Sequence, residues 1–219
     1  IDGNTYIDFC LGDTGSMTGH SPDATIAAIK RQADIGITSM LPTLDAAIVS
    51  KELAKRFGLP KWQFTVTATD ANRHVIRYCR LITGRSKTIV IDRCYHGSVD
   101  ETFATLDEAG NTVKREGNLG APVDLALTTR VVEFNDLVAM EAALAHGDVA
   151  AILMEPAMTN VGIVLPDEGY LFAVQGLAKK YGALLIIDET HTISVGPGGM
   201  TQDLGLKPDF LTIGKLSYL

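Results

Sequence analysis

Short apolar runs that end in polar or charged residues alternate along this chain with segments of helical periodicity. Such runs, bounded by glycine, proline or charge, are typical of buried strands, whereas apolar residues three and four positions apart are typical of helices. Because the two patterns alternate from residue 63 onward, the sequence predicts an α/β fold with a mostly parallel sheet sandwiched by helices. The strands are predicted at 63–67, 87–92, 129–134, 149–155, 183–188 and 210–214, and the helices at 22–32, 44–57, 70–82, 98–106, 136–145 and 168–181.

Composition excludes several classes of protein. A chain of 219 residues that is 46% hydrophobic can bury a substantial core. Its apolar runs are far shorter than the roughly 18 residues of a membrane-spanning helix. The net charge of −7 and the scattered lysines and arginines argue against nucleic-acid binding. Cys10, Cys79 and Cys94 lack metal-ligand spacing, so they predict reduced thiols in a cytoplasmic protein.

Both ends of the chain suggest a longer protein. The N-terminus has neither a start methionine nor a signal-peptide pattern, and it opens with a predicted β-hairpin around residues 2–4. The C-terminus follows the last predicted strand closely. Between residues 107 and 124 several glycines predict a long surface excursion.

Lys215 and Asp188 each end a predicted buried strand. Ligands of parallel sheets bind beyond the carboxyl ends of the strands, where these two residues can meet. A lysine buried there can attack an aldehyde, and pyridoxal phosphate needs such a lysine together with a carboxylate that keeps its pyridine nitrogen protonated. Taken singly, the aspartate is more typical of a loop or a helix cap, and the lysine of a solvent-exposed side chain.

Other strand ends carry polar groups that suit a cofactor. Residues 67–72 join a strand to a helix, whose N-terminus can bind a phosphate, although threonine and aspartate are also ordinary helix caps. Tyr95 or His96 can stack on a flat ring. Glu155 can orient a cofactor or substrate, or cap a neighbouring loop. No metal site is predicted, because Cys94, His96 and His191 lack the usual ligand spacing.

Eight motifs, in this order and spacing, resemble those of the class III pyridoxal-phosphate aminotransferases, and most closely the glutamate-1-semialdehyde aminomutase-like branch. The resemblance implies a fold-type-I large domain at residues 61–219, preceded by a hairpin and helices at 1–60 and truncated after the lysine, with the C-terminal small domain absent. The motifs are Asp2–Asp8, Gly19–Pro22, Thr67–Asn72, Tyr95–Gly97, Phe134–Asp136, Glu155–Pro156, Asp188–Thr190 and Ile213–Lys215.

The resemblance also implies roles for individual residues. Lys215 would form the Schiff base with pyridoxal 5'-phosphate and move the proton, and Asp188 would hold the pyridine nitrogen protonated. Ala68 and Thr69 would bind the phosphate, and Tyr95 would stack on one face of the ring. Thr190, where the family usually has valine, would lie under the opposite face. Glu155 would be the acid near cofactor and substrate. The phosphate turn departs from the family's Ser-Gly-Thr-Glu, and residues 216–219 depart from its glycine-rich turn.

The function predicted is that of an aminotransferase that moves an amino group between an amino acid or amino-ketone and a keto acid. It would work as a homodimer with a shared active site, without nucleic acid or membrane. The alternatives are a 2,1-aminomutase, an epimerase and an inactive fragment of such an enzyme. A nucleotide-binding doubly wound protein is disfavoured, because the chain contains neither a G-x-G-x-x-G nor a Walker pattern.

Overall fold

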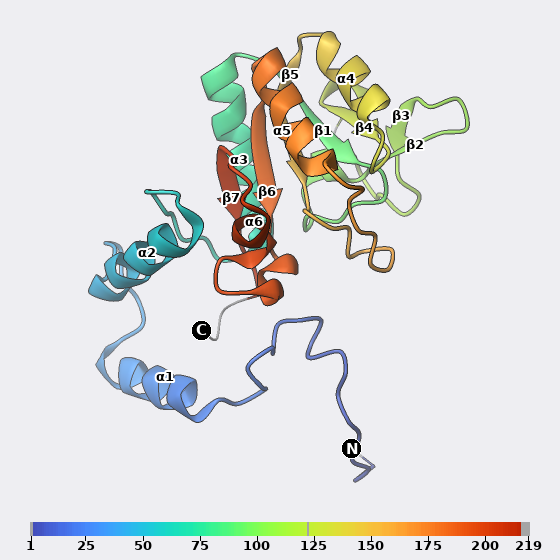
Figure 1. Ribbon diagram of the computed structural model, residues 1–219. Coiled ribbons are helices and arrows are strands. Elements are labelled where there is room, and N and C mark those ends of the chain that lie inside the picture. The colour runs from blue at the N-terminus through green and yellow to red at the C-terminus, as the bar shows by residue number, and fades with distance from the viewer. Residues whose placement is uncertain (1, 122, 216–219) are drawn as a thin grey trace.

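A parallel sheet forms the centre of the molecule (Figure 1). Within residues 2–121 and 123–215, which the computed structural model describes, its five strands lie in the order β4-β1-β5-β6-β7, and each neighbouring pair is parallel. The carboxyl ends of all these strands therefore lie along one edge. The strands are β1 (Lys87–Ile91), β4 (Thr129–Val132), β5 (Val149–Met154), β6 (Leu184–Asp188) and β7 (Phe210–Thr212).

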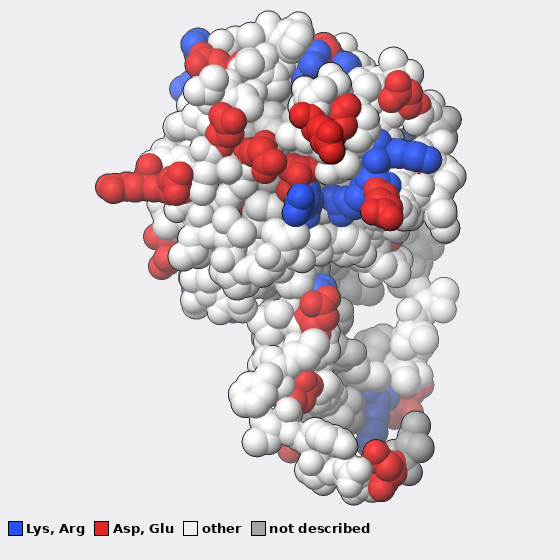
Figure 2. All heavy atoms as spheres, turned by 90° about the vertical axis from the view of Figure 1, so that its right-hand side faces the viewer, with Lys and Arg blue, Asp and Glu red and all other residues white. Residues whose placement is uncertain are grey.

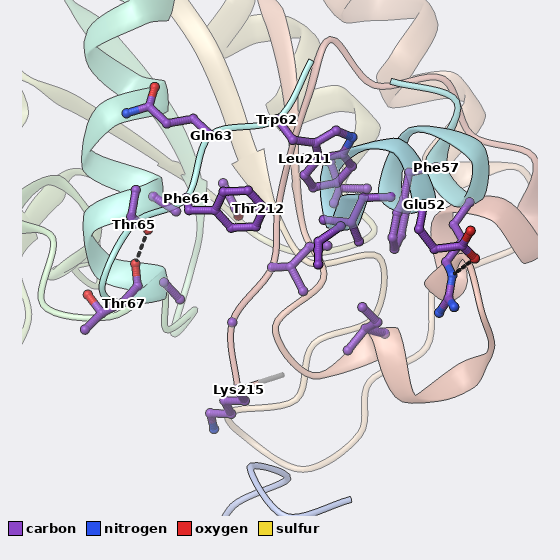
Figure 3. Close-up of a pocket in the computed structure, with 18 of the residues that line it drawn as sticks. Glu52, Phe57, Trp62, Gln63, Phe64, Thr65, Thr67, Leu211, Thr212 and Lys215 are labelled. Carbon is purple, nitrogen blue, oxygen red and sulfur yellow. Dashed lines mark hydrogen bonds and ion pairs between the residues drawn. The ribbon is translucent and has the colours of Figure 1, made fainter. Parts of the chain in front are cut away.

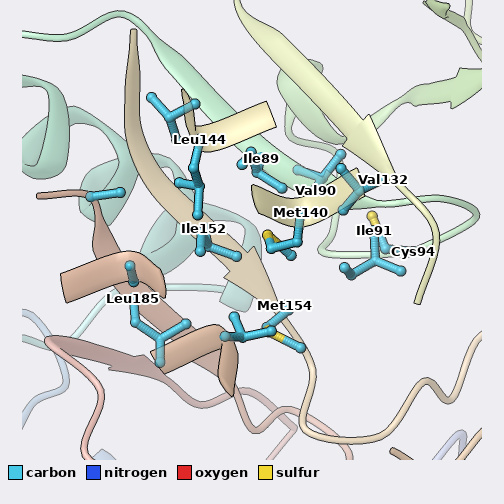
Figure 4. Close-up of a cluster of buried hydrophobic side chains, with 14 of the residues drawn as sticks. Ile89, Val90, Ile91, Cys94, Val132, Met140, Leu144, Ile152, Met154 and Leu185 are labelled. Atoms are coloured by element: carbon cyan, nitrogen blue, oxygen red, sulfur yellow. The ribbon is translucent and has the colours of Figure 1, made fainter. Parts of the chain in front are cut away.

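Helices cover both faces of this sheet. Alternate residues of a strand point to opposite faces, and β5 is buried along its whole length. Ile152 and Met154 pack against α4 and α5 (Figure 4), while Ala151 and Leu153 pack against α3. The three-layer α/β architecture predicted from the sequence is thus confirmed. The helices are α1 (Asp23–Ile35), α2 (Leu44–Phe57), α3 (Ala68–Thr83), α4 (Leu137–Ala145), α5 (Tyr170–Tyr181) and α6 (Gly199–Leu204), with 3-10 turns at Asp100–Thr102, Leu125–Leu127 and Thr192–Val195.

Residues 2–60 lie apart from the sheet (Figure 1). Neither α1 nor α2 has a buried residue. The hairpin predicted around residues 2–4 is wrong: the described residues there contain no strand. Tyr6 and Phe9 are 78% and 91% exposed, so this segment has no packed surface against which a marginally stable two-stranded hairpin could form.

Two further predictions of secondary structure differ from the structure. Residues 63–67 are irregular and pair with no strand of the described chain, and Val66 is 94% exposed. The helix predicted at 98–106 is a 3-10 turn followed by β2 (Ala104–Leu106), which pairs antiparallel with β3 (Thr112–Lys114). The segment predicted as a surface excursion, 107–124, therefore contains β3, one of the two strands of this hairpin. In both places strand pairing, which propensity does not specify, decided the conformation.

Charged side chains of both signs lie next to each other on the face shown in Figure 2. In the chain, Arg130 holds the Asp148 carboxylate with two hydrogen bonds of 2.9 and 2.8 Å. Among the described residues, no helix has the length and apolarity needed to cross a membrane.

Candidate active site

Polar side chains from four adjacent strands meet at the carboxyl edge of the sheet. His96 lies in the loop after β1, Glu155 directly follows β5, Asp188 ends β6, and Lys215 follows β7. These strands are neighbours in the order β1-β5-β6-β7, and Asp188 lies opposite Thr212 in the register. The prediction that the chain segments carrying Asp188 and Lys215 are neighbours in one sheet is therefore confirmed.

The Asp188 carboxylate is the centre of a buried hydrogen-bond network. Its Oδ2 accepts hydrogen bonds from His96 Nδ1 at 2.8 Å and Asn72 Nδ2 at 2.9 Å. Its Oδ1 accepts one from the Thr190 amide at 3.0 Å. Asn72 Oδ1 in turn accepts a hydrogen bond from Thr212 Oγ1 at 2.8 Å. The network fixes the carboxylate while leaving Oδ1 able to accept a second donor.

This network sets opposite charges on Asp188 and His96. Burial alone would raise the pKa of Asp188, but the hydrogen bonds from His96, Thr190 and Asn72 hold that pKa below its usual value. Burial alone would lower the pKa of His96, but the neighbouring Cys94 side chain and the Asp188 carboxylate raise it well above its usual value. The pairing therefore favours the ionised carboxylate and the protonated imidazole together.

Glu155 differs from Asp188 although both carboxyls are buried. Burial raises the pKa of Glu155, and among the described residues Thr159 alone donates hydrogen bonds to it, from Oγ1 at 2.5 Å and from N at 3.4 Å. Glu155 can thus carry a proton under conditions in which Asp188 is ionised. Two carboxyls with different protonation states give a site separate acidic and anionic groups.

The N-terminus of α3 faces the same edge. Thr67 is its N-cap and accepts a hydrogen bond from the Asp70 amide at 3.1 Å, so the helix begins at Ala68 rather than at the predicted residue 70. A capped α-helix still has free amides in its first turn, here those of Ala68 and Thr69. Thr69 Oγ1 accepts a hydrogen bond from the Ser98 amide at 3.1 Å, which joins the loop after β1 to this helix end. The arrangement suits an anion.

Gly97 allows this close approach. Its φ is +81°, and a Cβ built there would lie 2.0 Å from Thr69 Oγ1 and 3.0 Å from Thr69 Cα. We expect Gly97→Ala to lower the free energy of unfolding by more than about 1–2 kcal/mol, the cost of a left-handed conformation alone, because the loop must also move. Thermal unfolding of Gly97→Ala and Gly110→Ala separates the two effects, since Gly110 has φ +79° and no atom near its Cβ position. Equal Tm values for the two variants would contradict a required close approach.

Lys215 lies where the chain leaves the sheet. Its side chain is 23% exposed, its backbone is left-handed with φ +61°, and its Nζ donates to the carboxylate of Asp13. Nζ also lies 3.0 Å from His191 Nε2. Lys215 is therefore partly buried and tethered on two sides. The departure at residues 216–219 lies outside the described residues.

Two cavities are lined by residues of this site or by their hydrogen-bond partners. The larger, of about 810 Å³, is lined by Lys215 and Ala68 and by apolar side chains that include Trp62, Phe64 and Leu211 (Figure 3). The smaller, of about 340 Å³, is lined by Asp13, Tyr95, Thr159, Asn160 and His191. Lys215 lines the first cavity and hydrogen-bonds to two residues that line the second, so its amine stands between them.

Several residues of this site were not predicted. Asn72 is fully buried on the α3 face that also carries Ile76 and Cys79. A polar residue in an apolar stripe signals a buried hydrogen-bond network, and this signal was present in the sequence. For His96 the sequence indicated ring stacking and argued against a metal site, whereas its imidazole pairs with Asp188. The pairing of Asp13 with Lys215 has no local signal.

Comparison with known proteins identifies the family. The sequence model described as Aminotransferase class-III matches residues 1–217. The chain is 35% identical over 220 residues to the glutamate-1-semialdehyde 2,1-aminomutase of Methanocaldococcus jannaschii, covering 99% of this chain and 52% of that protein. The chain thus spans about half the length of the curated relatives it matches.

Solved structures of similar proteins support the same family assignment. The crystal structure of a glutamate-1-semialdehyde-aminomutase from Pseudomonas aeruginosa PAO1 matches with a TM-score of 0.96 and 56% identity, over 98% of this chain and 48% of that one. A variant of that protein was solved in complex with PMP. An omega-transaminase from Sphaerobacter thermophilus matches with a TM-score of 0.91 and 28% identity, over 98% and 51% of the two chains. The predicted fold-type-I architecture is confirmed, and the chain belongs to the class-III aminotransferase family.

Proposed function

We propose that this protein binds pyridoxal 5'-phosphate through Lys215 and transfers amino groups. The observation that supports this most strongly is the buried, ionised Asp188, which ends β6 beside the segment that carries Lys215. A carboxylate held charged by three donors suits a protonated pyridine nitrogen. The family membership and the PMP complex of the Pseudomonas protein support the same cofactor.

The described residues fit such a cofactor. A Cβ at Gly214 would lie 2.6 Å from the Ala68 Cβ and 3.1 Å from Thr190 Oγ1, so the phosphate turn, the ring wall and the lysine segment converge there. Thr190 Oγ1 is buried without a hydrogen-bond partner among the described residues, which leaves it free to contact a bound group. Ala68 and Thr69 would hold the phosphate with their amides, and Tyr95 and Thr190 would hold the two ring faces.

Each residue has a distinct task in this proposal. When bound, pyridoxal phosphate supplies an electron sink for the substrate carbon. Asp188 keeps the pyridine nitrogen protonated, and His96 and Asn72 hold Asp188 in place. Lys215 Nζ would hold the cofactor and would take and return the proton at the substrate carbon. Glu155, whose pKa burial raises, can donate a hydrogen bond to cofactor or substrate.

The amino transfer has two candidate forms. Transfer between an amino donor and a keto acid is favoured by the family description and by the omega-transaminase. Intramolecular transfer, as in a 2,1-aminomutase, is favoured by the names of the Methanocaldococcus and Pseudomonas proteins. We place the aminotransferase first because the family model covers nearly the whole chain. We also propose that this chain binds the cofactor and that the active protein is a homodimer.

A single assay separates the two forms. An aminotransferase requires an external acceptor, so turnover of an amino substrate should stop after one equivalent unless a keto acid is added. Keto-acid release and the cofactor spectrum, recorded with and without added acceptor, measure this requirement. Sustained isomerisation of one substrate without acceptor would replace the aminotransferase by the aminomutase. Lack of any pyridoxal phosphate binding would reject both.

A further inference from the structure

His191 contacts the amine of Lys215 directly. His191 Nε2 lies 3.0 Å from Lys215 Nζ, and its Nδ1 lies 3.1 Å from Thr14 Oγ1. Thr14 and Asp13 belong to a turn in which consecutive residues are left-handed, with φ of +53° at Leu11, +55° at Asp13 and +64° at Thr14. Left-handed non-glycine residues persist where the surrounding structure determines them. This turn brings two polar side chains to Lys215 and His191 from far away in the sequence.

The hydrogen bonds determine the tautomer of the His191 ring. The Lys215 amine is paired with the Asp13 carboxylate, and an ammonium group can only donate. His191 Nε2 must therefore accept the hydrogen bond from Lys215, and the neutral ring must carry its proton on Nδ1. Nδ1–H then donates to Thr14 Oγ1. Thr14 thereby orients the ring.

The surroundings keep this ring neutral. Burial and the positive charge of Lys215 lower the pKa of His191, against the opposing effect of the Asp13 and Asp188 carboxylates. The neutral acceptor thus persists below the usual histidine pKa of 6.5 and disappears as pH falls through the lowered pKa. A protonated ring and an ammonium group cannot hydrogen-bond to each other.

We infer that His191 is a positioning residue for Lys215: its neutral imidazole, oriented by Thr14, accepts a hydrogen bond from the lysine and holds Nζ between the two cavities. Protonation of His191 removes this acceptor, so the rate at which Lys215 reacts depends on the charge of His191. The inference deepens the proposed function, because it concerns the amine to which that function assigns the reaction.

The first test uses histidine-selective NMR on the protein without cofactor. We expect His191 to be neutral with its proton on Nδ1 at pH 7, and Lys215→Met to raise its pKa, because removing a nearby cation favours the charged ring. Thr14→Val should reduce the population of the Nδ1–H tautomer. The exposed His146 serves as the internal reference and should not change. An unchanged His191 titration in Lys215→Met would overturn the inference.

The second test compares His191→Phe with His191→Gln. The rate at which the visible absorbance develops on mixing with pyridoxal phosphate should fall about 10- to 100-fold in His191→Phe, as expected for losing a hydrogen bond to a charged group. Gln can place an acceptor oxygen near the position of Nε2 but cannot titrate. At pH 8 the His191→Gln variant should therefore develop the absorbance faster than His191→Phe. Its rate should also not decline at low pH, as the rate of the unmodified protein should.

The two tests distinguish the inference from the proposed function. A wild-type rate and pH profile in His191→Phe would overturn the inference even if the cofactor is bound to Lys215. Failure of every variant to bind the cofactor would instead reject the proposed function, and the NMR titration would still decide whether His191 and Lys215 are coupled.

Discussion

Lys215→Ala is expected to abolish covalent attachment of pyridoxal phosphate and to lower turnover by at least about 10²–10⁴-fold, the usual contribution of a positioned acid–base group. The reason is that Lys215 Nζ is the amine held between the two cavities by Asp13 and His191. Borohydride reduction followed by peptide mass spectrometry measures the attachment: the unmodified protein should carry one pyridoxyl group, on Lys215.

The matched control is Lys207→Ala, because Lys207 is exposed and lies just before β7. This variant should keep both the adduct and the turnover. A pyridoxyl group found on Lys179, Lys180 or Lys207 of the unmodified protein would show that Lys215 is not the attachment site.

Asp188→Ala and Asp188→Asn are expected to differ in stability but to share a loss of activity. Alanine removes the acceptor of the buried His96 and one of the two acceptors of Asn72, and breaking such a buried charged pair costs about 3–5 kcal/mol. Asparagine keeps an acceptor oxygen and should cost less. Both remove the negative charge, so kcat and kcat/KM should fall together, by about 10²–10³-fold. Denaturant unfolding and steady-state kinetics measure the two effects.

The stability difference between the unmodified protein and Asp188→Asn should depend on pH. The lowered pKa of Asp188 gives stabilisation that is present above its usual value of 3.8 and lost as pH falls through the lowered pKa. The raised pKa of His96 gives stabilisation that is present below its usual value of 6.5 and lost as pH rises through the raised pKa. The difference should therefore be greatest between these two usual values and shrink toward alkaline pH.

Asp203→Asn, an exposed change on α6, is the control and should show no such dependence. A pH-independent difference for Asp188→Asn would mean that Asp188 and His96 are not an ion pair. Full turnover in this variant would remove Asp188 from the mechanism.

The sequence by itself determined the layers of the fold and the edge at which the site lies. Buried runs that end in Asp188 and Lys215 place these residues at strand ends because parallel strands all end on one edge. The sequence also predicts that helices such as α3, α4 and α5 cover the sheet, because strand and helix periodicities alternate. These periodicities depend only on neighbouring residues.

Only the tertiary structure decided which side chains pair across that edge. Asn72 and His96 meet Asp188 because α3 and the loop after β1 pack there, and Gly97 permits the approach. Asp13 reaches Lys215 from more than 200 positions away through a left-handed turn. The strand at 104–106 replaced a predicted helix for the same reason: a partner strand was available in space. Hydrogen bonds between distant segments depend on packing, and local patterns do not encode them.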